Sequence, residues 1–260
     1  MTGISVVIIT FNEEKNLGRC LESIRSVADE VVVIDSSSTD STVAIAQEYG
    51  ARVIDHPFAG YGQQKNFAVG QANHNWVLSL DADEALTPEL AKNILSLKDG
   101  PQYDVYEMPR LTNYCGKWIR HCGWYPDRQT RLFDRTKGHW AEQKVHEYWK
   151  TSDAGAAKGL LKGDLLHYSF RSIHEHLKKI EKYSELGARE AVEGGKNASL
   201  LKVMLYPGWR FIVDYIFRLG FMDGFYGYLI CKLAAHAAFI KYAKIRLYKK
   251  QRDKGGVTLA

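Results

Sequence analysis

The chain has 260 residues, of which 45% are hydrophobic and 25% are charged, and its formal net charge is +5. This composition is that of an ordinary globular protein and excludes a disordered or collagen-like chain. The charge is too modest to indicate a nucleic-acid-binding protein, so we expect no nucleic acid among its partners. Four cysteines without a Cys-x-x-Cys pair predict free thiols in a reducing cytosol.

Short apolar runs alternate with amphipathic segments in the first hundred residues. We predict strands over Ile4–Thr10, Glu30–Asp35, Ala51–Ile54 and Trp76–Leu80. Helices are expected between these strands, the first over residues 17–27 and the third over residues 62–72. The second helix is expected to begin after a cap at Ser38 or Asp40, and the fourth to begin at Thr87-Pro88, with Thr as the cap. This alternation predicts an α/β fold with a mostly parallel sheet and helices on both faces.

The pattern loosens after residue 100. Further strands are expected over Asp104–Met108, Gln129–Phe133 and Gly163–Phe170, and a long helix over Ser172–Glu193. The segment Asn113–Asp127 is rich in aromatic residues, glycine and cysteine. It is interpreted either as a mobile loop on the side of a second substrate or as a packed excursion of the chain. Residues 207–208, Pro-Gly, are predicted to break the chain.

Two carboxylates follow the predicted strand Trp76–Leu80. In an extended backbone, residues two apart point to the same side, so Asp81 and Asp83 are expected to face one spot. Ligands of open α/β sheets bind at the carboxyl ends of strands. A divalent cation with diphosphate oxygens would suit this spot. The alternative is a solvated acidic loop.

Polar residues also follow the first and second predicted strands, over residues 10–14 and 35–38. An aspartate at a strand end is the usual partner of ribose hydroxyls, although Asp35 alone also fits a helix cap or a turn. Three such strand ends in one parallel sheet predict a bound nucleotide. No Gly-x-Gly-x-x-Gly follows the first strand and no Gly-x-x-x-x-Gly-Lys-Ser/Thr occurs, which disfavours dinucleotide-binding and P-loop proteins.

Three motifs in this order, Ser5–Glu13, Val31–Asp40 and Leu80–Glu84, resemble those of family 2 glycosyltransferases with the GT-A fold. The later segments Gly123–Phe133 and Val145–Glu147 resemble a subgroup that glucosylates the inner core of lipopolysaccharide. The resemblance implies an inverting, metal-dependent hexosyltransferase. The expected donor is UDP-glucose, and the expected acceptor is a hydroxyl of a lipopolysaccharide-core or other lipid-linked glycan.

The resemblance also assigns roles to residues. Those expected to bind the nucleotide sugar are Thr10, Asn12, Glu14, Asp35, Ser37, Lys65, Asp81, Ala82 and Asp83. Asp81 and Asp83 are the expected ligands of Mg²⁺ or Mn²⁺, which would offset the charge that builds on the leaving diphosphate. Arg128 and Arg131 carry fork-shaped donors that suit a phosphate of donor or acceptor, although an ion pair at a strand edge fits them equally.

Inversion needs one general base that takes the proton of the acceptor hydroxyl. The Glu-Asp pair that often supplies this base in the family is absent here. Glu147 is the first candidate and Asp127 the second. Glu147 would otherwise be a surface carboxylate or an ion-pair partner of Lys144 or Lys150.

The last ninety residues are expected to form a separate part. We predict a catalytic domain over residues 1–170 and a helical extension over 171–260. Apolar residues recur in the extension at helical spacing, and a basic cluster follows them. These residues are Phe211, Ile212, Tyr215, Ile216 and Leu219, then Lys241, Lys244, Arg246, Lys249, Lys250 and Arg252. Charged residues interrupt every window of about 20 residues, which excludes a spanning helix.

This pattern predicts peripheral binding to an anionic membrane surface, on the inner face of the cytoplasmic membrane. Packing on the catalytic domain or within a homo-oligomer is the alternative. Three other functions remain open at this stage. A nucleotidyltransferase would need a Gly-rich, Arg-containing loop after the first strand, which is absent. A glycosyltransferase acting on polyprenyl phosphate and a catalytically inactive sugar-nucleotide-binding protein are the other two.

Overall fold

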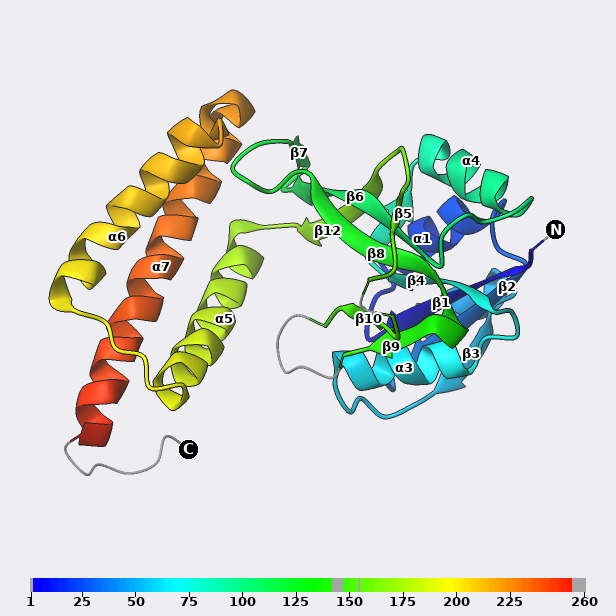
Figure 1. The fold of residues 1–260 in the computed structure, drawn as a ribbon, viewed down its shortest axis with the longest axis horizontal. Helices are drawn as coiled ribbons and strands as arrows, with labels where there is room; N and C mark the ends of the chain where they lie inside the picture. The colour runs from blue at the N-terminus through cyan, green and yellow to red at the C-terminus, as the bar shows by residue number, and fades with distance from the viewer. Residues whose placement is uncertain (1, 142–146, 154, 254–260) are drawn as a thin grey trace. The chain divides into compact units, whose positions relative to one another are not determined.

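The computed structural model describes residues 2–141, 147–153 and 155–253. The chain divides into two compact units. The first comprises residues 1–111 and 126–168, and the second comprises residues 112–125 and 169–260 (Figure 1).

The first unit is built on a sheet whose amino-terminal strands are all parallel. They are β1 (Ile4–Thr10), β2 (Glu30–Asp35), β3 (Arg52–Asp55) and β4 (Trp76–Asp81), in the spatial order β3-β2-β1-β4. The sheet continues from β4 through β8 (Asp127–Asp134), β6 (Val105–Tyr114), β12 (Leu165–Phe170) and β5 (Glu84–Leu86). Strand β8 is antiparallel to both β4 and β6, and β11 (Gly159–Leu160) is parallel to β6. Strands β9 (Gly138–Trp140) and β10 (Trp149–Thr151) form a separate antiparallel ribbon.

The sheet has a hydrophobic core on each face because successive strand residues point to opposite sides. Helices α1 (Leu17–Ile24), α2 (Thr42–Glu48) and α4 (Pro88–Leu97) pack on one face, against residues such as Ile8 and Leu78. Helix α3 (Tyr61–Gly70) packs on the other face, against Val7 and Val77. Figure 1 shows α3 on the opposite side of the sheet from α1 and α4. The predicted α/β class, with helices on both faces, is confirmed.

Two predicted helix starts can be compared with the structure. Thr87 caps α4 by accepting a hydrogen bond from the backbone N–H of Leu90 at 3.3 Å, with Pro88 in the first turn, as predicted. For α2, Asp40 accepts a hydrogen bond from the N–H of Thr42 at 3.0 Å. The other candidate cap, Ser38, instead donates its hydroxyl to Asp35 at 2.6 Å.

The second unit consists of helices and a hairpin. Its helices are α5 (Ile173–Glu193), α6 (Leu200–Ile212) and α7 (Gly224–Asp253), with a π-helical turn η2 (Val213–Phe217) and a 3-10 turn η3 (Gly220–Asp223) between the last two. The predicted break at Pro207 is wrong, because Pro207 lies inside α6. Proline removes one helical hydrogen bond, and the packing of α6 along α7 stabilises the helix around that gap. In the described part of the chain, each helix is too short or too polar to cross a membrane.

The segment 113–127 is largely a hairpin that packs within the second unit. Strand β6 continues to Tyr114, and β7 (Lys117–Ile119) pairs with it. Tyr114 and Cys122 are buried with Ile230 of α7. Asp223 ties the end of this hairpin to η3 by accepting the backbone N–H of His121 at 2.8 Å. These contacts fit the interpretation of the segment as a packed excursion of the chain better than the interpretation as a mobile loop.

His176 makes the second unit sensitive to acid. Its ring is buried and lies 3.0 Å from the hydroxyl of Tyr114, and burial together with the charge of Lys179 lowers the pKa of His176 to about 4. The unfolded chain binds this proton near pH 6.5. The neutral ring therefore contributes its full stability above pH 6.5, and the contribution is lost as the pH falls towards 4.

We predict that the free energy of unfolding falls less in the His176→Gln variant than in the wild type when the pH is lowered from 7.5 to 4.5. The two decreases should differ by about 2 kcal/mol, because glutamine does not titrate. Thermal unfolding followed by circular dichroism at the two pH values measures this difference. The matched control is His174→Gln, at an exposed position two residues away. If both variants show the acid sensitivity of the wild type, His176 is not its source.

Candidate active site

The carboxyl end of β4 carries a buried ionic network. The two carboxylate oxygens of Asp81 contact different cations, because Oδ1 lies 3.0 Å from Nζ of Lys65 and Oδ2 lies 2.7 Å from Arg131. Arg131 also lies 2.7 Å from Oε1 of Glu84, which is fully buried. Two carboxylates three residues apart are therefore bridged by one guanidinium, which β8 places beside them, and Arg110 also lies 3.4 Å from Glu84.

These contacts fix the charge of both partners. Burial opposes ionisation of Asp81, but the positive charges of Arg131 and Lys65 outweigh it and hold the pKa of that carboxyl well below its ordinary value. Burial likewise opposes the charge of Arg131, and Asp81 and Glu84 raise its pKa above the ordinary value. Asp81 is thus a carboxylate across the physiological pH range.

Both candidate bases belong to this network. Glu147 lies at the far side of Lys65, whose Nζ is 3.1 Å from Oε1 of Glu147 and 4.9 Å from the ring centre of Trp140. Asp127 receives two hydrogen bonds on Oδ2 from Arg110, at 2.6 and 2.9 Å. Lys65 is 1% exposed, so it is a bridge between carboxylates in this structure. Residues 142–146, including Val145 and His146 of the predicted motif, lie outside the described residues.

Asp83 lies apart from these ion pairs, although it is only two residues from Asp81. Its Oδ2 is 3.3 Å from Nε2 of His167, on β12. His167 was not a candidate from sequence, because only the pairing of β12 with β5, in register opposite Glu84, brings it there. Ala82, between the two aspartates, is buried and belongs to the hydrophobic core.

We tested whether these residues fit a divalent cation. Asp83 supplies a carboxylate oxygen, a ligand that suits Mg²⁺ and Mn²⁺, and His167 supplies a ring nitrogen beside it. Asp81 fits less well, since both its oxygens already contact cations. Among residues 2–141, 147–153 and 155–253, no group of three or more His, Cys, Asp or Glu side chains is placed to hold a metal. Asp83 and His167 are therefore candidate ligands for the predicted metal, and Asp81 stays a prediction for the same role.

The predicted nucleotide-binding residues gather at the ends of β1 and β2, which are neighbours in the sheet. Thr10 and Asp35 are partners in the strand register, and the Thr10 hydroxyl donates to Asp35 at 2.8 Å. Asp35 is 2% exposed and also accepts the backbone N–H of Ser38 at 2.7 Å. The carboxylate of Asp35 thus organises the turn after β2, as the alternative interpretation of a turn residue requires.

The loop after β1 is held against the same turn. Asn12, whose φ is 54°, accepts the N–H of Thr39 on its side chain at 2.8 Å, and Glu14 accepts the N–H of Ser41 at 3.2 Å. Ser37 is turned the other way, because its hydroxyl donates to Asp55 at the end of β3. Thr10, Asn12, Glu14 and Asp35 therefore form one cluster, from which Ser37 is directed away.

Arg128 and Arg131 lie in different environments. Arg128 is exposed, whereas Arg131 is 3% exposed, and its Nε has no hydrogen-bond partner among the residues that the structure describes. The side chain of Arg131 is committed to Asp81 and Glu84. Arg131 therefore forms ion pairs from a strand that lies between β4 and β6, and the phosphate role stays a prediction.

A sheet of this order, with acidic residues at the end of its fourth strand, defines the GT-A class of nucleotide-sugar transferases. The model of the family "Glycosyl transferase family 2" matches residues 5–155, and the chain belongs to this family.

Two relatives match nearly the whole chain. The lipopolysaccharide core biosynthesis glycosyltransferase LpsC of Rhizobium meliloti is 35% identical over 259 residues, which covers 93% of this chain and 91% of the relative. An uncharacterized glycosyltransferase of Rickettsia prowazekii is 33% identical over 255 residues, which covers 95% of this chain and 87% of the relative.

Two solved structures are also similar. TarS of S. aureus has a TM-score of 0.46 and 16% identity, and the match covers 98% of this chain and 92% of TarS. Glucosyl-3-phosphoglycerate synthase of Mycobacterium tuberculosis, solved with Mn²⁺, UDP and glucosyl-3-phosphoglycerate, has a TM-score of 0.36 and 26% identity over 41% of this chain and 43% of that chain.

We predict that Arg131→Met lowers the free energy of unfolding by about 3–5 kcal/mol, because it removes the nearest cation from the fully buried Glu84 and one of the two cations that contact Asp81. Urea denaturation measures the change. The matched control is Arg128→Met, three residues away on the same strand and exposed, which should change stability by less than about 0.5 kcal/mol. Equal losses in the two variants would contradict the role of Arg131.

Proposed function

We propose that the protein is an inverting hexosyltransferase that moves glucose from UDP-glucose to a hydroxyl of a lipopolysaccharide-core or other lipid-linked glycan. The observation that supports it most is the geometry at the strand ends. Asp83 follows β4, and its Oδ2 lies 3.3 Å from Nε2 of His167. The cluster of Thr10 and Asp35 lies at the carboxyl ends of the strands β1 and β2, beside β4 in the sheet. The relative LpsC, named for lipopolysaccharide core biosynthesis, supports the acceptor class.

In this proposal the donor lies across the carboxyl ends of β1, β2 and β4. Thr10, Asn12, Glu14 and Asp35 line the uridine and ribose side, with Ser37 at its edge. Asp83 and His167 would hold Mg²⁺ or Mn²⁺, which offsets the charge on the leaving diphosphate. Further residues that we propose near the donor are Lys65, Asp81 and Ala82, with Arg128 near a phosphate.

Glu147 is the proposed general base. Lys65 fixes the position of its carboxylate through Oε1 and connects it to Asp81. Both oxygens of Asp127, in contrast, already accept hydrogen bonds, Oδ2 from Arg110 and Oδ1 from Gln129 at 2.8 Å. If Asp127 accepted a proton from the acceptor hydroxyl, its hydrogen bonds with Arg110 and Gln129 would be weakened or lost. Glu147 is therefore favoured as the base.

We further propose that residues 1–170 form the catalytic domain and that residues 171–260 associate with a membrane. The location would be cytoplasmic and peripheral, on the inner face of the cytoplasmic membrane, where a lipid-linked acceptor is accessible. A homo-oligomer through the helices of the second unit is the alternative.

A second candidate acceptor is polyprenyl phosphate. The dolichyl-phosphate hexose transferase of Haloferax volcanii is 37% identical over 113 residues, which covers 42% of this chain and 48% of that relative. Assays with a glycan acceptor and with a polyprenyl phosphate, each with UDP-glucose, separate the two acceptors. A protein that has lost catalysis would bind the donor and turn over neither.

We predict that Asp83→Asn reduces Mn²⁺-dependent release of UDP from UDP-glucose by a factor on the order of 100, while the protein remains folded. The amide keeps the shape of the side chain but loses the negative charge that attracts a cation. The control is Asp99→Asn, at an exposed position, which should leave the rate unchanged. Wild-type activity in Asp83→Asn would remove the metal role from this residue.

We predict that Glu147→Gln retains the dissociation constant for UDP-glucose but loses turnover by a factor of about 100 or more, because the amide cannot accept the proton. Calorimetry measures binding, and UDP release measures turnover. Asp127→Asn is the matched variant and should retain most of the turnover. The opposite result, with Asp127→Asn inactive and Glu147→Gln active, would transfer the role of base to Asp127.

A further inference from the structure

One side of helix α6 exposes a continuous apolar stripe. Its residues recur at spacings of three and four, the period of one helix face, and each side chain is 44–67% exposed. They are Leu201, Met204, Leu205, Trp209 and Ile212 on α6, and Ile216 in the turn η2 that follows it. Apolar residues around η3 continue the exposed set beyond the helix. These are Phe217, Phe221, Met222 and Phe225, at 46–69% exposure.

This stripe differs from the face predicted from sequence. Phe211 and Tyr215, two residues of that prediction, are only partly exposed and pack against the buried cluster around Ile230. Ile212 and Ile216 are exposed and belong to the stripe. The exposed apolar face of α6 is therefore the one that begins at Leu201, and the residues that pack against the cluster lie on another face.

The segment that carries the stripe is rich in basic residues. Residues 197–252 contain ten Lys and Arg residues but only two acids, Asp214 and Asp223. Both acids are buried, at 1% and 6% exposure, and Asp214 is paired with Arg210 and Arg218. The solvent-facing charges of this segment are therefore basic.

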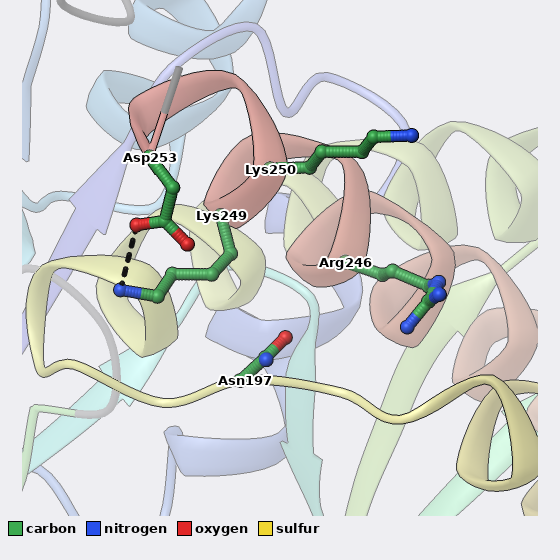
Figure 2. A pocket seen from close by; sticks show the side chains of 5 residues that line it. All are labelled: Asn197, Arg246, Lys249, Lys250 and Asp253. Atoms are coloured by element: carbon green, nitrogen blue, oxygen red, sulfur yellow. Dashed lines mark ion pairs between the residues drawn. The ribbon is translucent and has the colours of Figure 1, made fainter. Parts of the chain in front are cut away.

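The predicted basic cluster at the end of α7 has two roles. Lys244 lies 2.8 Å from Glu185 of α5, and Arg252 donates to the carbonyl of Val192 at 2.9 Å, so these two residues hold helices together. Three others, Arg246, Lys249 and Lys250, line a cavity of about 350 Å³ beside Asn197, just before α6 (Figure 2). Its lining residues are Asn197, Arg246, Lys249, Lys250 and Asp253. Lys249 is paired with Asp253 at 3.1 Å, which leaves the cavity with excess positive charge.

We propose that the outer face of α6 and the apolar tip at η3 insert into the interfacial region of an anionic lipid leaflet, with the surrounding Lys and Arg residues at the level of the headgroups. An apolar helix face with tryptophan and aromatic residues, bordered by basic residues, has the composition of interfacial helices. This inference rests on the proposed membrane location and assigns it to a specific surface.

The charge pattern favours lipid over a second copy of the chain. Two copies joined through this stripe would bring their basic borders together, and juxtaposed like charges oppose association. An anionic leaflet is complementary to the same border, and each basic residue near it adds to the attraction. The apolar stripe and its basic border thus fit one partner.

The test is flotation of the full-length protein with vesicles of phosphatidylcholine alone or mixed with phosphatidylglycerol, at low and at high salt. Wild type should float with the anionic vesicles at low salt and be released in part by high salt. In Leu205→Glu, which places a negative charge in the stripe, the partition onto anionic vesicles should fall at least about tenfold. Leu160→Glu is the matched control, because Leu160 is similarly exposed, at 55% against 60%, on β11 of the first unit.

Several results would overturn the inference. The first is that Leu205→Glu floats with anionic vesicles as well as the wild type does. The second is that Leu205→Glu and Leu160→Glu lose the same fraction of vesicle binding. The third is that the wild type does not bind anionic vesicles. A wild-type dimer in light scattering that Leu205→Glu dissociates, without vesicle binding, would assign the stripe to a second copy instead. UDP release from UDP-glucose, with a soluble glycan acceptor and without vesicles, is measured in parallel and should be unchanged in Leu205→Glu. If vesicle binding depends on the stripe but no variant or wild type releases UDP, docking stands and the proposed transfer fails.

Discussion

The bridge that Arg131 makes between Asp81 and Glu84 is the interaction on which the site depends. A turn that places two carboxylates three residues apart, one of them fully buried, is unfavourable unless cations lie beside them, because a desolvated charge costs several kcal/mol. Arg131 reaches both at 2.7 Å from the neighbouring strand β8. The end of β4 is thereby fixed in a conformation in which Asp83 lies beside His167.

The order of strands then explains how distant segments form one site. The carboxyl ends of β1, β2 and β4 lie at the same edge because these strands are parallel and adjacent, in the order β2-β1-β4. The antiparallel strands complete the site from the other side. Strand β8 contributes Arg131 and Asp127, and β12 contributes His167. The site is therefore assembled across almost the whole sheet of the first unit.

The strands and helices of the amino-terminal half could be predicted because their apolar residues have a clear period and their caps are local. The positions of Thr10, Asp35 and Asp81 at strand ends followed from the same periodicity. The ion pairs could not be predicted, because they join residues far apart in the chain, such as Lys65 and Glu147. His167 depended likewise on a strand pairing that its own sequence does not specify.

The carboxyl-terminal helices show the limit of local patterns in another way. The apolar residues after 200 fit helical spacing on more than one face, so sequence alone could not select the buried one. Proline predicted a break at residue 207, but tertiary packing overrides this local preference. Contacts with α5 and α7 decide which basic residues remain available for a partner.

Calorimetric titration of UDP-glucose into the full-length protein, with Mn²⁺ and again with the metal chelated, tests the central claim most directly. The account predicts binding in the presence of Mn²⁺ and an affinity at least about tenfold weaker without it. Equal affinity under both conditions, or no binding of UDP-glucose in either, would contradict a metal-assisted donor site at the end of β4.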